Sequence, residues 1–69
     1  MNELVYAVFY LNNNDEITIE GKSVFHVFLE LNRRFPEGLS CIDIGFSGKD
    51  EEDSKKNLQE FLNLYNKGK

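Results

Sequence analysis

One segment near the start of the chain, Leu4–Leu11, constrains the fold more than any other. It consists of β-branched, aromatic and large aliphatic residues around a single alanine, a composition typical of a β-strand. Side chains alternate between two faces along a strand. Both faces are apolar here, one formed by Val5, Ala7, Phe9 and Leu11 and the other by Leu4, Tyr6, Val8 and Tyr10. We therefore expect this strand at the centre of a sheet, with a neighbour on each side.

A second strand is predicted at Glu16–Glu20, where Ile17 and Ile19 alternate with polar residues. The intervening Asn12–Asp15 is a turn cluster, because Asn and Asp side chains bond to nearby backbone and tolerate left-handed dihedral angles. Directly opposite residues of a sheet share a face, so the isoleucines can meet the apolar face of the first strand only across a loop with an odd number of residues. A three-residue loop, Asn12–Asn14, with Asn14 left-handed meets this condition.

The register that follows is fully specified. On one face it pairs Phe9 with Ile17 and Ala7 with Ile19; on the other it pairs Tyr10 with Glu16, Val8 with Thr18 and Tyr6 with Glu20.

Two amphipathic helices are predicted from apolar residues that recur at helical spacing. The first spans about Lys22 to Arg34, with a stripe of Val24, Val27, Phe28, Leu31 and Phe35. Phe25 and Leu29 widen this stripe, and we expect the second helix to cover them; if it does not, they form a second apolar contact site. The second helix begins with the acidic run Asp50–Asp53, which the helix dipole favours, and ends near Asn66. Its stripe is Leu58, Phe61, Leu62 and Tyr65.

A turn at Phe35–Gly38 separates the first helix from a third strand, predicted over Leu39–Phe46. Simple alternation places Ile42, Ile44 and Phe46 on the core face of this strand, and Cys41 and Asp43 on the opposite face.

The elements together predict an α+β fold with the order β-β-α-β-α, in a single small domain over residues 1–66 followed by a frayed tail over 67–69. Two helices can cover only one face of a three-stranded sheet, so the other face is left open. The strand order is either 2-1-3 or 1-2-3. We prefer 2-1-3, because it puts the strand that is apolar on both faces in the middle.

Charge and cysteine content restrict the partners and the compartment. The chain has 12 acidic and 8 basic residues and a formal net charge of −4, so it lacks the positive surface that nucleic-acid binding usually requires. No apolar run approaches the roughly 20 residues of a membrane span. The single cysteine, Cys41, excludes an intrachain disulfide and favours a reducing compartment, which points to the cytoplasm.

Patterns associated with catalysis are incomplete. Gly45–Lys49 resembles a nucleophile elbow, but Lys49 stands where the last glycine belongs, and the only histidine, His26, is expected on the polar side of the first helix. As a phosphate-binding loop the same segment fails, because Asp43 replaces the first glycine and Asp50 the final Ser or Thr. We therefore predict that the protein is not an enzyme and has no catalytic residues.

Metal ligands are equally sparse. One cysteine and one histidine are too few for a zinc site, and Asn12–Glu16 matches a calcium loop only in spacing. The acids at Asp50–Asp53 are explained by their position at a helix start. The sequence predicts no metal and no cofactor.

The open face of the sheet is the most informative surface that the sequence predicts. Tyr6, Val8 and Tyr10 run down its middle, flanked by Glu16, Thr18 and Glu20 on one side and by Cys41 and Asp43 on the other. All of these except Cys41 are assigned to the candidate binding surface. Tyrosine offers a large contact area with a polar tip and is enriched at binding surfaces. The face is either an ordinary solvated sheet surface, a docking surface for a partner with a basic patch, or a surface for self-association. Stacked nucleic-acid bases would require basic residues around the tyrosines, and the rim is acidic.

These observations favour a small acidic, non-enzymatic protein-binding module. It would act as an inhibitor or accessory factor of a larger basic protein, for example one that processes nucleic acid. Small acidic proteins encoded by phages and other mobile elements often work in this way. The alternative is a homodimeric structural protein that assembles through its open sheet face or an edge strand.

Overall fold

The structure, a computed structural model, describes residues 4–67. Five elements follow one another along the chain: β1 (Val5–Tyr10), β2 (Glu16–Gly21), α1 (Val24–Arg34), β3 (Asp43–Phe46) and α2 (Glu51–Lys67). The predicted order β-β-α-β-α is confirmed. Of the predicted tail, residue 67 belongs to α2, and residues 68–69 lie outside the described residues.

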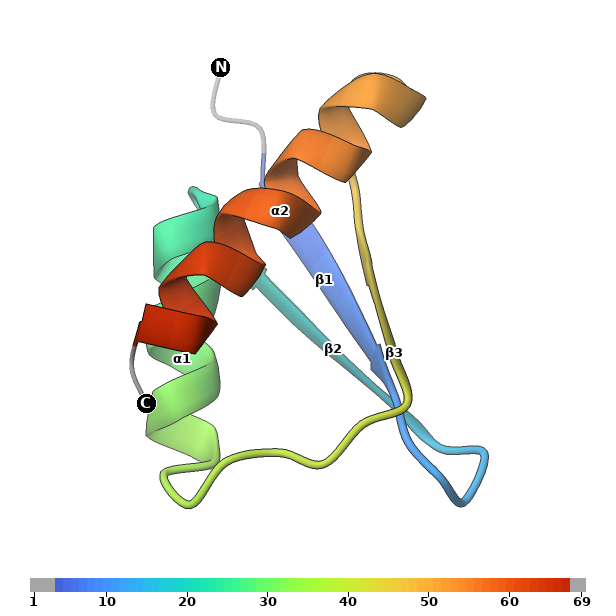
Figure 1. Ribbon diagram of the computed structural model, residues 1–69, viewed down its shortest axis with the longest axis vertical. Coiled ribbons are helices and arrows are strands. Elements are labelled where there is room, and N and C mark those ends of the chain that lie inside the picture. Colours follow the sequence, from blue (N-terminus) through green and yellow to red (C-terminus); the bar gives the residue numbers. More distant parts are fainter. Residues whose placement is uncertain (1–3, 68–69) are drawn as a thin grey trace.

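The three strands form one antiparallel sheet in the order β2-β1-β3, so the strand that is apolar on both faces is central, as predicted (Figure 1). The hairpin register is also as predicted: Tyr6 pairs with Glu20, Ala7 with Ile19, Val8 with Thr18, Phe9 with Ile17 and Tyr10 with Glu16.

The hairpin loop has the predicted length of three residues. The amide of Leu11 donates to the carbonyl of Asp15 at 2.9 Å and closes the loop around Asn12–Asn14. Asn14 has a φ of 69°, in the left-handed region that asparagine tolerates better than most residues. Loop length and turn chemistry therefore fix the same register as the apolar pattern.

Both helices pack on one face of the sheet, α1 against β2 and α2 against β3, and leave the other face open (Figure 1). Phe61 of α2 is fully buried at the centre of the core. Its ring lies 5.2 to 6.2 Å, centroid to centroid, from the rings of Phe9, Phe28, Phe46 and Tyr65. The other buried apolar residues are Ala7, Ile19, Val24, Val27 and Leu31.

Side chains just before each helix define where it begins. The hydroxyl of Ser23 accepts the amide N–H of His26 at 3.3 Å, so Ser23 is the N-cap, and α1 begins two residues later than predicted. At α2, a carboxylate oxygen of Asp50 accepts the amide of Asp53 at 2.8 Å, and the Asp53 carboxylate accepts the amide of Lys49 at 3.0 Å. Asp50 and Asp53 thus cap α2, and their negative charges also interact favourably with the helix dipole.

The third strand departs from its prediction. It spans only Asp43–Phe46 instead of Leu39–Phe46. The amide of Ile42 donates to the carbonyl of Tyr10 at 2.8 Å, although the register partner of Tyr10 is Asp43. Two consecutive residues therefore oppose one, as in a β-bulge, and the alternation of side chains is interrupted.

This interruption corrects two placements. Ile42, predicted in the core, is 67% exposed, whereas Cys41, predicted on the open face, packs against the core. Ile44 and Phe46, which follow the bulge, face the core as predicted.

The first helix also exposes more apolar surface than expected. Phe25 and Leu29 are 49% and 47% exposed, so α2 does not cover them. The ring of Phe25 lies 6.4 Å from that of Phe28, which in turn contacts Phe61. Phe25 and Leu29 therefore form an exposed apolar extension of the core on the surface of α1.

Candidate partner-binding surface

The open face carries all seven residues that the sequence assigns to a binding surface. Tyr6 and Tyr10 are 44% and 41% exposed, with the half-buried Val8 between them on β1. The four remaining residues are all exposed: Glu16, Thr18 and Glu20 on β2, and Asp43 on β3. Within residues 4–67, no helix covers this face.

The tyrosines lie directly beside glutamates. Hydrogen-bonded and non-hydrogen-bonded pairs alternate along an antiparallel ladder. Because Leu11 bonds to Asp15, the Tyr10–Glu16 and Tyr6–Glu20 pairs are of the non-hydrogen-bonded kind, in which side chains approach most closely. Each aromatic ring at the centre of the face thus has a carboxylate as its neighbour.

The acidic residues of this face have no basic neighbour on the three strands. None of the three strands contains a lysine, arginine or histidine. Within residues 4–67, Glu16, Glu20 and Asp43 form no ion pair. The face therefore has an apolar centre and an acidic rim whose carboxylates form no ion pair with the described residues.

Two acidic residues on the helices, Glu30 and Glu51, do have basic partners. Glu30 binds Arg33 at 2.6 Å and Arg34 at 2.8 Å, and its hydrogen bonds to these two guanidinium groups lower the pKa of the Glu30 carboxyl to about 2. Glu51 lies 3.8 Å from Lys55. These carboxylates already have basic partners on their own helix.

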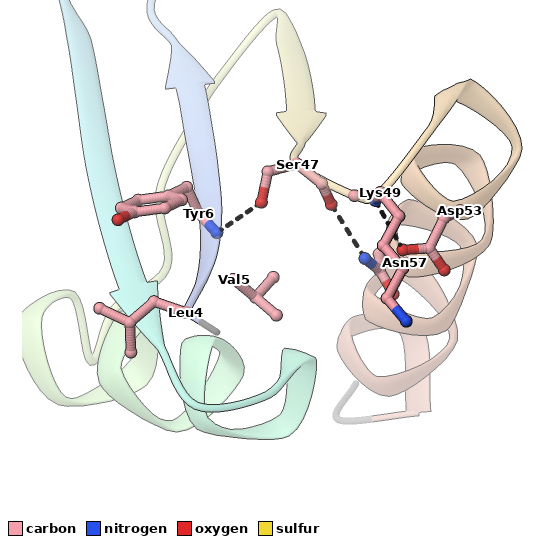
Figure 2. A pocket seen from close by; sticks show the side chains of 8 residues that line it. Leu4, Val5, Tyr6, Ser47, Lys49, Asp53 and Asn57 are labelled. Atoms are coloured by element: carbon pink, nitrogen blue, oxygen red, sulfur yellow. Dashed lines mark hydrogen bonds between the residues drawn. The ribbon is translucent and has the colours of Figure 1, made fainter. Parts of the chain in front are cut away.

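A groove of about 510 Å³ lies where the start of β1, the end of β3 and the start of α2 meet (Figure 2). Several of its polar groups bond to one another. The Ser47 hydroxyl accepts the Tyr6 amide at 2.9 Å, and the Ser47 carbonyl accepts the Asn57 side-chain amide at 2.9 Å. Asp53 accepts the amide of Lys49. These groups join the sheet to α2, so the polar lining of the groove has a structural explanation.

The nucleophile-elbow pattern around Ser47 has no catalytic geometry in the described part of the chain. The Ser47 hydroxyl binds backbone, as described above. The imidazole of His26 lies at the start of α1, where its Nδ1 is 2.8 Å from the Ser23 hydroxyl. His26 is exposed, on the polar side of α1 as predicted.

Cys41 has the character of a packing residue. Its side chain lies beside Phe9, Leu39 and Phe61. Burial, and secondarily the negative charge of Asp43, raises the pKa of the Cys41 thiol, which disfavours the reactive thiolate.

Sequence reasoning missed one exposed apolar feature on the edge of the sheet. Ile42 borders a shallow groove of about 220 Å³ between β3 and α2, together with Ile44, Leu58 and Leu62. The residue pattern of Leu39–Phe46 contains no signal for it, because simple alternation sends Ile42 to the core. Only the bulge opposite Tyr10 places Ile42 at the surface.

Comparisons with known proteins give no assignment: no family model, no curated protein and no solved structure matches this chain. Among the described residues, no group of three or more His, Cys, Asp or Glu side chains could hold a metal ion. No helix within residues 4–67 is long and apolar enough to cross a bilayer.

Proposed function

We propose that this protein is a small, non-enzymatic protein-binding module that docks its open sheet face on a basic patch of a larger protein, as an inhibitor or accessory factor. One observation carries the proposal: Tyr6, Val8 and Tyr10 are flanked by carboxylates that form no ion pair within residues 4–67. A basic partner supplies the missing counter-charge, which steers the encounter, while the tyrosines provide the buried contact area. A protein that processes nucleic acid is a fitting target, since its own ligand is also anionic.

The proposal is tested by capture from lysate of the source cells. The bait is the full chain, compared with the Tyr6→Ser, Tyr10→Ser double variant. The matched control is Phe25→Ser, Leu29→Ser, which removes the other exposed apolar pair and leaves the sheet face unchanged. We expect one dominant partner with a basic surface, retained by the control, lost with the tyrosine variant and weakened by salt.

Three results contradict the proposal. They are equal capture by wild type and tyrosine variant, a partner without a basic surface, and the absence of any partner. Circular dichroism of both variants confirms that they fold, so that loss of capture reports on the surface.

A second candidate function is homodimerisation through the outer edge of β3. The observation in its favour is the exposed Ile42 beside the apolar groove with Leu58 and Leu62. Two observations oppose self-association. The Asp43 carboxylate accepts the N–H of Ile44 at 2.9 Å and so occupies an edge amide, and a dimer through the open faces would bring two acidic rims together.

Sedimentation equilibrium distinguishes the two candidates. The protein-binding module predicts a mass near 8.0 kDa, and the homodimer predicts about twice that value. Under the homodimer hypothesis, Ile42→Asp returns the mass to that of the monomer.

A further inference from the structure

The two tyrosines on the open face have different surroundings. Tyr10 has a carboxylate on each neighbouring strand, because its register partners are Glu16 on β2 and Asp43 on β3. Tyr6 pairs with Glu20 on β2, but on the β3 side its amide binds the Ser47 hydroxyl. Only Tyr10 is therefore flanked by negative charge on both sides.

The ring of Tyr10 also leans across β3. A Cβ atom placed on Gly45 would lie 4.0 Å from Cε2 of Tyr10, although the register partner of Gly45 is Val8. The ring thus occupies space that a longer side chain at position 45 would fill. It rests over bare backbone while its side chain remains 41% exposed.

Both flanking carboxylates are available to a ligand. Glu16 forms no ion pair within residues 4–67, and its side chain is exposed. Asp43 uses one oxygen to accept the Ile44 amide at 2.9 Å, which holds its carboxylate in place and leaves the second oxygen free to accept another hydrogen bond.

We infer that the partner presents an arginine side chain to this position, with its guanidinium stacked on the Tyr10 ring and hydrogen-bonded to Glu16 and Asp43. This inference rests on the proposed function and specifies the chemistry that the face recognises. Arginine fits better than lysine because its planar guanidinium stacks on aromatic rings, pairs with carboxylates through two N–H groups and is more weakly hydrated than an ammonium group. Lysine offers a compact, strongly hydrated point charge that cannot stack as a plane on the ring.

The inference is tested with two peptides of equal charge, acetyl-Gly-Arg-Gly-Arg-Gly-amide and acetyl-Gly-Lys-Gly-Lys-Gly-amide. Each is titrated into the ¹⁵N-labelled full chain while amide chemical shifts are followed. We expect the arginine peptide to bind about two- to fivefold more tightly than the lysine peptide, the difference typical of an exposed cation–π contact. The largest shifts should fall on Tyr10, Glu16, Asp43 and Gly45.

Two pairs of matched variants locate the site. Glu16→Gln and Glu20→Gln each remove one negative charge from the same strand and weaken general attraction alike, but only Glu16→Gln should abolish the preference for arginine. Gly45→Val keeps every charge yet needs the space of the Tyr10 ring, so it should also abolish the preference. Gly45→Ala should retain it, since its Cβ makes only ordinary contact with that ring.

Three results overturn the inference. They are equal affinity for the two peptides, the same loss of arginine preference with Glu16→Gln as with Glu20→Gln, and no binding at millimolar peptide. Such a result leaves the proposed function standing if lysate capture still depends on Tyr6 and Tyr10. Conversely, an arginine preference at Tyr10 without capture of a basic protein supports the site chemistry and contradicts the proposed function.

Discussion

The two faces of one short sheet differ in burial and in charge. On β1, Ala7 and Phe9 are buried under the helices, while Tyr6 and Tyr10, one residue away along the chain, are exposed. The charges follow the same division. In the helix layer, Glu30 pairs with two arginines and Asp50 caps the start of α2, whereas the carboxylates of the sheet face form no ion pair within residues 4–67. Changes on the covered face should therefore alter folding, and changes on the open face should alter binding.

The largest effect is expected from Phe61→Ala on the covered face. Phe61 is fully buried against four other aromatic rings, so its truncation leaves a cavity and should cost about 3–5 kcal/mol of folding free energy. A domain of this size has roughly that much stability in total, so the variant should be largely unfolded. Urea denaturation followed by circular dichroism measures the loss.

The matched change on the open face is the Tyr6→Ser, Tyr10→Ser double variant. Each tyrosine contributes a cross-strand pair of about 0.2–1 kcal/mol, so the variant should stay folded. Equal destabilisation by the two variants would remove the distinction between the faces.

Gly48→Ala should produce the next largest effect. A Cβ at Gly48 would lie 2.5 Å from the backbone nitrogen of Ser54 and 2.8 Å from the carbonyl carbon of Asp53, so the start of α2 must move. Overpacking of this kind costs about 1–3 kcal/mol. Thermal unfolding measures it, with Gly45→Ala as the control, since a Cβ there meets only the Tyr10 ring at 4.0 Å. A Gly48→Ala protein as stable as the Gly45→Ala protein would show that α2 is not held closely at this point.

Ser47→Ala tests the connection between the two faces. The Ser47 hydroxyl binds the amide of Tyr6, which belongs to the open face, and the Ser47 carbonyl binds Asn57 on α2. Loss of the hydroxyl should cost about 0.5–1.5 kcal/mol and increase hydrogen exchange at the Tyr6 amide. The Tyr10 amide, at the far end of the same strand, serves as the internal reference. Unchanged exchange at Tyr6 would mean that this bond contributes nothing to the sheet end.

The β1–β2 side of the sheet could be predicted from the sequence because several local signals agree there. Side-chain alternation in Glu16–Glu20, the Asn-rich turn and the parity of the loop all require the same register. The open face follows from the same reasoning, since two helices cannot cover both sides of three strands. The sequence therefore placed the seven candidate residues on this face correctly. Their role in binding stays a prediction.

The β3 side could not be predicted in the same way. The bulge forms because the Ile42 amide bonds to the Tyr10 carbonyl. No feature of the local sequence indicates this bond. One extra residue reversed the assignments of Cys41 and Ile42. Similarly, the spacing of Phe25 and Leu29 shows that they are apolar but not how far α2 extends over them.

The smallest effect is expected from the ion pairs of Glu30 on α1. Hydrogen bonds from Arg33 and Arg34 lower the pKa of the Glu30 carboxyl from 4.5 to about 2 in the folded protein. A carboxyl whose pKa is depressed by folding contributes stability above its unfolded pKa, and this contribution is lost as the pH falls toward the folded value. The wild type should therefore lose stability relative to Glu30→Gln between about pH 4.5 and pH 2. Because these ion pairs lie at the surface, the difference in stability should be small and should shrink with salt.

Urea denaturation of wild type and Glu30→Gln across this pH range measures the difference. Parallel pH profiles of the two proteins would show that Glu30 is not bound by the arginines in solution. Glu30 would then resemble the sheet-face carboxylates, which form no ion pair within residues 4–67.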